Sequence, residues 1–132
     1  MKKLISILFL LVFHVAVKSQ SCDKLQELSL YYFQNNKYEE SLKYSLEGLD
    51  VCKKTYGENS KEYALSCFSA AQIYSTIKDH PSSLNYYFKS EEITKSLGKE
   101  FYYMHASILL SIGDTYYSLQ SFQNAEKYYI KY

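Results

Sequence analysis

The chain has 132 residues, 47% apolar and 22% charged, with one Pro and four Gly, a composition that excludes disordered, collagen-like and linker-type proteins. All 15 basic residues are lysines, and against 14 acidic residues they give a net charge of +1, which excludes a strongly basic nucleic-acid-binding protein. The length predicts one small domain. The 16 tyrosines are the unusual part of the composition, and we expect few of their side chains to be fully exposed to water.

Residues 1–19 predict a secretory signal peptide. They have a positive start at Lys2 and Lys3, an apolar run over residues 4–17, and short side chains before a cleavage site ahead of Gln20. The apolar run is shorter than the roughly 20 residues of a membrane span. We therefore expect export to the periplasm, cell envelope or medium; an uncleaved N-terminal anchor is the alternative. Without residues 1–19 the chain keeps 12 lysines and 14 acidic residues, so charge gives it no reason to bind nucleic acid or an anionic membrane.

Residues 20–132 repeat with a period of 42. Two columns of the repeat hold tyrosine in every unit: Tyr32, Tyr74 and Tyr116, and Tyr44, Tyr86 and Tyr128. Two further columns hold only small residues: Ser29, Ala71 and Gly113, and Ser41, Ser83 and Ala125. Eight columns of matched side-chain size share this register, which predicts a helical repeat architecture.

Each unit is predicted to be an antiparallel helical hairpin. The first helix of each unit shows apolar or small residues at i, i+3, i+4 and i+7, the spacing of one helix face. The second helices are predicted at about Lys37–Lys54, Pro81–Ser96 and from Phe122 onward, after short polar turns. The hairpins then span about 22–55, 64–97 and 106–132. Gly57 and Ser60 supply the stop and start signals between the first two hairpins.

These columns resemble those of tetratricopeptide repeat proteins, and the longer period resembles the kinesin-light-chain-like subclass, here of a bacterial exported type. The resemblance is carried by Leu28-Ser29 with Tyr38 to Leu42, by Ala70-Ala71 with Ser83-Leu84, and by Ile112 to Tyr116 with Phe122 to Ala125. It implies an all-α fold, a right-handed α-solenoid of about three antiparallel hairpins. Ser45 departs from the family pattern, because a large ring is usual at its position.

The resemblance also implies where a partner binds. In this family the first helices line a groove for peptides, which here places these residues in a partner-binding groove: Gln26, Phe33, Gln34, Phe68, Gln72, Asp114 and Tyr117. The family's carboxylate clamp of Lys, Arg and Asn is absent, so the groove suits an uncharged or mildly apolar peptide. The alternative is that these side chains only pack against neighbouring helices.

The sequence offers no catalytic site, cofactor site or metal site, and we expect a non-enzymatic protein. His80 takes a ring column and His105 has no Cys or His at metal-ligand spacing. Cys22 begins the first helix of a hairpin and Cys52 is near the end of the second, so an exported chain is predicted to join them in a disulfide. Cys67 would then be buried and inert; three free thiols are the alternative.

The last hairpin is predicted to lack a cap. Solenoids need polar ends, yet Phe122, Tyr128, Tyr129 and Ile130 would be exposed on the last helix. We expect a module that binds a protein or peptide in its groove and that self-associates through the last hairpin. The alternative is the N-terminal regulatory or sensor arm of a longer exported or membrane-anchored protein, whose peptidase-like or kinase effector lies outside these residues. A structural spacer is the third interpretation.

Overall fold

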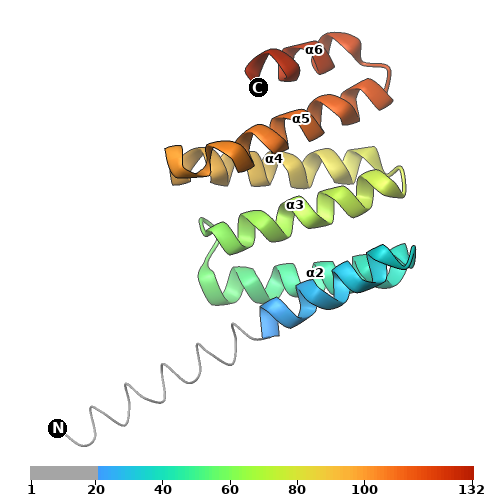
Figure 1. Cartoon of the computed structure of the whole chain (residues 1–132), viewed down its shortest axis with the longest axis vertical. Helices are drawn as coiled ribbons and strands as arrows, with labels where there is room; N and C mark the ends of the chain where they lie inside the picture. The colour runs from blue at the N-terminus through green and yellow to red at the C-terminus, as the bar shows by residue number, and fades with distance from the viewer. Residues whose placement is uncertain (1–20) are drawn as a thin grey trace, which may run out of the picture.

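A computed structural model describes residues 21–132, so the predicted signal peptide lies outside the described residues. This part is a row of helices without a strand. A helix over residues 21–34 is followed by α2 (Tyr38–Tyr56), α3 (Lys61–Thr76), α4 (His80–Leu97), the 3-10 turn η1 (Lys99–Phe101), α5 (Tyr102–Ser118) and α6 (Phe122–Lys131). The helices stack along the long axis of the molecule, from helix 21–34 and α2 at one end to α6 at the other (Figure 1). The fold is an α-solenoid of three hairpins.

The turn inside each hairpin has the same backbone conformation. It places one residue at positive φ, at Asn36 (58°), Lys78 (65°) and Gln120 (58°). The next residue closes the turn by donating its backbone N–H over 2.9 Å to a tyrosine carbonyl: Lys37 to Tyr32, Asp79 to Tyr74 and Ser121 to Tyr116. This left-handed residue ends the first helix of each hairpin and reverses the chain within a few residues.

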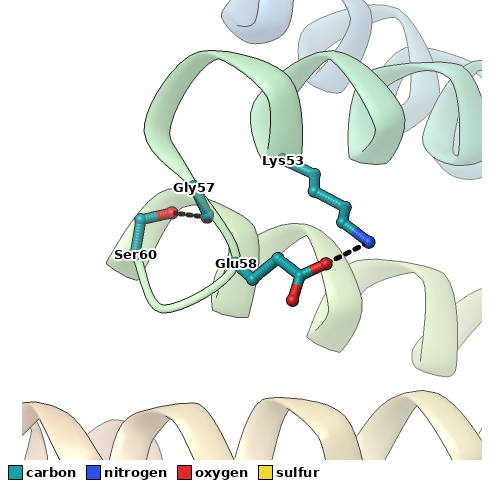
Figure 2. A network of polar contacts seen from close by, with 4 residues as sticks. All are labelled: Lys53, Gly57, Glu58 and Ser60. Atoms are coloured by element: carbon teal, nitrogen blue, oxygen red, sulfur yellow. Dashed lines mark hydrogen bonds and ion pairs between the residues drawn. The ribbon is translucent and has the colours of Figure 1, made fainter.

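The loop between the first two hairpins is held by local contacts. Gly57 ends α2 at a φ of 92°, and Ser60 caps α3 by accepting a hydrogen bond from the Tyr63 N–H at 3.2 Å. The Ser60 hydroxyl donates to the Gly57 carbonyl at 2.8 Å, and Lys53 forms an ion pair with Glu58 across the loop (Figure 2). The predicted stop and start at these residues are confirmed, although α3 already begins at Lys61, before the expected start at 64.

The second connection differs from the prediction. Gly98, at a φ of 100°, ends α4, and η1 then leads directly into α5 at Tyr102, before the expected start at 106. Met104 explains the early start, because it packs against both buried apolar clusters of the molecule and so fixes the first turn of α5.

Small and aromatic columns hold the hairpins together. Ser29 and Ser41 exchange hydrogen bonds between hydroxyl and backbone carbonyl, at 2.9 and 2.8 Å, and Ser83 donates to the Ala71 carbonyl at 3.0 Å. The tyrosine columns form one stacked pair in each hairpin, with ring centroids 5.3 to 5.7 Å apart: Tyr32–Tyr44, Tyr74–Tyr86 and Tyr116–Tyr128. Short side chains bring the two helices close, and the ring pairs fill the space beside them.

The outer face of α6 is exposed only in part. Phe122 and Ile130 are 58% and 78% exposed. Tyr128 corrects the prediction, because its ring is half-buried between Tyr116 and Phe88, with centroids at 5.7 and 6.0 Å. It belongs to the packing between the second and third hairpins and not to a free edge.

Candidate functional site: a pocket between the first two hairpins

A pocket of about 120 Å³ lies between helix 21–34 and α3, with one residue contributed by α2. Its lining is uncharged and consists of Gln26, Ser29, Leu30, Phe33, Ser45, Ser66, Ser69, Gln72 and Ile73. Three of the predicted groove residues, Gln26, Phe33 and Gln72, are brought together here. Leu30, Phe33 and Ile73 supply apolar surface, whereas the serines and glutamines supply hydroxyl and amide groups.

Gln26 connects the pocket to the disulfide. Its Nε2 donates to the Ser66 hydroxyl at 2.6 Å and lies 3.3 Å from Cys52 Sγ. Cys22 and Cys52 are joined in the structure, with their Cα atoms 5.4 Å apart, and both are essentially inaccessible to solvent. The bond ties the start of helix 21–34 to the end of α2, and Gln26 bridges this junction to α3.

The remaining predicted groove residues lie outside this pocket. Phe68 is half-buried and packs against Tyr87, with ring centroids 5.6 Å apart, in the cluster between the second and third hairpins. Gln34 is exposed near the end of helix 21–34. Asp114 and Tyr117 are exposed on α5, where Asp114 accepts a 2.7 Å hydrogen bond from the Tyr129 hydroxyl and Tyr117 packs edge-on against Phe122. Within the predicted groove, the pocket therefore lies between the first two hairpins. Phe68 packs in the interior and does not line this pocket.

Cys67 and His105 take part in packing within the described part of the chain. Burial raises the pKa of Cys67 to about 11, so its thiol stays protonated near neutral pH. His105 Nδ1 lies 3.2 Å from the Thr94 hydroxyl, a contact that joins α5 to α4. Residues 21–132 contain no cluster of three His, Cys, Asp or Glu side chains able to hold a metal ion, and no helix among them is long and apolar enough to span a membrane.

Ser45, which lines the pocket from α2, is one of the lining residues that are not among the predicted groove residues. It appears in the sequence only as a departure from a ring column, and its place in the pocket depends on contacts across two hairpins. Ser66 and Ser69, which complete the wall from α3, carry no signal of their own in the sequence.

Comparisons with known proteins agree with this architecture. The family model for the tetratricopeptide repeat matches residues 22–96. The fold is similar to BtubC (BKLC) from P. vanneervenii, with a TM-score of 0.77 at 19% identity over 81% of this chain and 43% of that one. It is also similar to a putative kinesin light chain with nearly identical TPR-like repeats from Podosopora anserina, with a TM-score of 0.71 at 14% identity over 80% of this chain and 50% of that one.

The chain spans half or less of the length of these two solved structures, and at these identities the likeness concerns the fold alone. No curated protein matches the sequence. The family match covers more than half of the chain, and the third hairpin, which lies beyond it, has the same turn and the same stacked tyrosine pair as the first two. The chain belongs to the tetratricopeptide repeat family.

Proposed function

We propose that the chain is a non-enzymatic interaction module that binds an uncharged or mildly apolar segment of a protein or peptide in the groove of its first helices. Tetratricopeptide repeats are in general protein-interaction modules. The observation that carries the proposal is the pocket, which combines the apolar surface of Leu30, Phe33 and Ile73 with hydroxyl and amide groups and contains no charged side chain. Such a lining suits a segment that brings an apolar side chain and backbone polar groups.

The test is a selection of binding peptides from a random display library with the oxidised chain. Leu30 is 56% exposed, so Leu30→Lys puts a charge at the pocket without disturbing the core. We expect this substitution to weaken the selected peptides at least about tenfold, because a charge at an apolar contact must be desolvated. The matched control is Ile77→Lys at the hairpin turn, 43% exposed, which should leave binding unchanged. Selection of no groove-dependent peptide would favour the structural spacer.

We also propose that residues 1–19 direct export and are then removed. The support is the charged and apolar pattern of those residues, together with a Cys22–Cys52 disulfide of the kind that persists in oxidising compartments. The test is the intact mass of the natural protein, purified without reductant. A mass that begins at Gln20 and lacks two protons is expected; retention of residues 1–19, or alkylation of both cysteines without prior reduction, would contradict the proposal.

The alternative function is the recognition arm of a larger exported or membrane-anchored protein. Its support is the exposed Ile130 on α6, since Phe88, at the corresponding position of α4, is covered by Tyr116 and Tyr128 of the next hairpin. The same intact-mass measurement separates the two, because a natural protein tens of kilodaltons heavier contains a further domain. In both cases the partner is a protein or peptide and no cofactor is involved. Neither nucleic acid nor membrane is proposed as a partner, because the chain without residues 1–19 has a slight excess of acidic residues.

A further inference from the structure

The interface between the second and third hairpins shows how this repeat normally fills its interior. Tyr87 on α4 is 4% exposed and packs with Ala71 and Phe68 of its own hairpin and with Ile108 and Ile112 of the next. Its hydroxyl lies near the side chain of Ser111 on α5. One buried phenol ring therefore fills the space that two hairpins leave between them.

The interface between the first and second hairpins lacks this ring. The positions 42 residues earlier are these: Ser45 for Tyr87, Gln26 for Phe68, Ser29 for Ala71, Ser66 for Ile108 and Ser69 for Ser111. All five of these residues line the 120 Å³ pocket. The pocket is thus the space that a tyrosine occupies one repeat later. Four of these five side chains are smaller or more polar than their counterparts, and Ser69 is identical to its counterpart.

The size and chemistry of the pocket correspond to a phenol ring. A dry cavity of about 150 Å³ in another protein holds one benzene molecule, so a volume of about 120 Å³ that opens to solvent admits one ring. A hydroxyl on that ring would find Ser69, which stands at the position of Ser111 one repeat later, and the side-chain amide of Gln72, because both line the pocket.

From this we infer that the pocket binds a tyrosine side chain of the partner peptide, which takes the place of the ring that Ser45 leaves out. The inference rests on the proposed function and names the residue that its groove selects. Leu30, Phe33 and Ile73 contact the faces of the ring, and Ser69 and Gln72 pair with its hydroxyl. Phenylalanine in the same place would offer these polar groups no hydrogen bond, so tyrosine is preferred.

The test uses p-cresol, which is the tyrosine side chain alone, and the oxidised wild-type chain. A ligand of about eight non-hydrogen atoms is expected to bind with a dissociation constant on the order of 1 mM, measured by protein-observed NMR titration. Toluene, which lacks the hydroxyl, should bind at least about fivefold more weakly. Failure of p-cresol to shift the resonances of pocket residues, or equal binding of toluene, would overturn the inference.

Two sets of variants keep the test independent of folding. Ser45→Tyr fills the pocket with a ring and should weaken the binding of p-cresol at least about tenfold. Ser45→Ala leaves the space open and should retain the binding of p-cresol. The double variant Ser69→Ala with Gln72→Leu keeps the pocket volume similar. It should weaken the binding of p-cresol about fivefold and leave the binding of toluene unchanged. Equal p-cresol binding by wild type and a folded Ser45→Tyr protein, or by wild type and the Ser69–Gln72 double variant, would refute the assignment.

The outcome can be separated from that of the proposed function. If selected peptides bind and lose affinity with Leu30→Lys, yet neither contain tyrosine nor compete with p-cresol, the groove binds peptides and the tyrosine assignment fails. If p-cresol binds as expected and no peptide is selected, the pocket binds a phenol ring, and the proposal that the groove binds peptides is contradicted.

Discussion

Single residues at the hairpin turns carry a conformational cost that can be removed. Lys78 has a φ of 65°, in the left-handed region where a side chain with a Cβ is disfavoured. We expect Lys78→Gly to raise the free energy of unfolding by about 0.5–1 kcal/mol, measured by urea denaturation. The matched control is Lys43→Gly on the exposed side of α2, where the same replacement should cost about 1 kcal/mol. Destabilisation by Lys78→Gly would show that its side chain contributes more than its backbone costs.

Among the tyrosines with a raised pKa, Tyr63 and Tyr129 are expected to ionise near pH 12 and to make the stability of the fold depend on alkaline pH. Burial raises the pKa of Tyr63 to about 12, and the hydrogen bond to Asp114 raises the pKa of Tyr129 to about 12. Because these values exceed the ordinary value near 10, the stability that they contribute is present below pH 10 and is lost as the pH rises towards 12.

The ultraviolet absorbance of tyrosinate, followed during an alkaline titration, checks this expectation. Tyr129→Phe should remove one late-ionising group, and Asp114→Asn should make Tyr129 ionise earlier while Tyr63 remains late. If the Asp114→Asn titration coincides with that of wild type, the hydrogen bond does not control Tyr129.

At the scale of helices, the crossing of α5 and α6 depends on a glycine. A Cβ placed on Gly113 would lie 2.5 Å from Cε1 of Tyr129, so the ring must move and give up its bond to Asp114. We expect Gly113→Ala to lower the free energy of unfolding by about 1–2 kcal/mol, a steric loss partly offset by helix propensity. Gly48→Ala, whose Cβ would lie 3.2 Å from Leu25 Cβ and 3.8 Å from the next nearest atoms, should be close to neutral. In a Tyr129→Ala background, which lacks the ring, Gly113→Ala should no longer lower the free energy of unfolding.

The helices themselves are largely predictable because their signals are local. Gly57 and Ser60 stop and cap helices by their own backbone and side-chain chemistry, and Pro81 occupies the first turn of α4 as expected. The start of α3 at Lys61 precedes the predicted start at 64, and there the Ser60 cap is the local signal that marks it. The start of α5 also precedes the predicted residue 106, because Met104 packs against two clusters that include side chains of α3 and α4.

The candidate site is predictable only in part, for the same reason. The resemblance to the repeat family places Gln26, Phe33 and Gln72 in one groove, and the structure brings them to one pocket. The resemblance also places Phe68 in that groove, but the Tyr87 ring of the neighbouring helix packs against it. The pocket at Ser45 is formed by side chains of three helices. The repeat pattern in the sequence does not predict how much space remains between these helices.

For the whole molecule, the two ends of the stack differ in chemistry. On helix 21–34, exposed Lys24 and Glu27 take the positions that Ile108 and Ser111 occupy on α5, so the first end carries charges there, beside the 59% exposed Tyr31. At the other end, Ile130 is 78% exposed at the position where α4 carries the covered Phe88. Two copies of such a stack bury the most apolar surface when the α6 end of one packs against the α6 end of the other in a symmetric dimer.

We therefore expect the purified chain to self-associate through α6, to an extent that rises with concentration in sedimentation velocity experiments. Ile130→Lys should shift the population to monomers, because a charge at the contact of two apolar ends cannot be desolvated without a partner. Ile77→Lys introduces the same charge at a hairpin turn and should leave the association unchanged. An equal effect of the two substitutions would attribute the change to net charge alone. A monomeric wild-type chain at every concentration would mean that the α6 end needs a different partner to cover it.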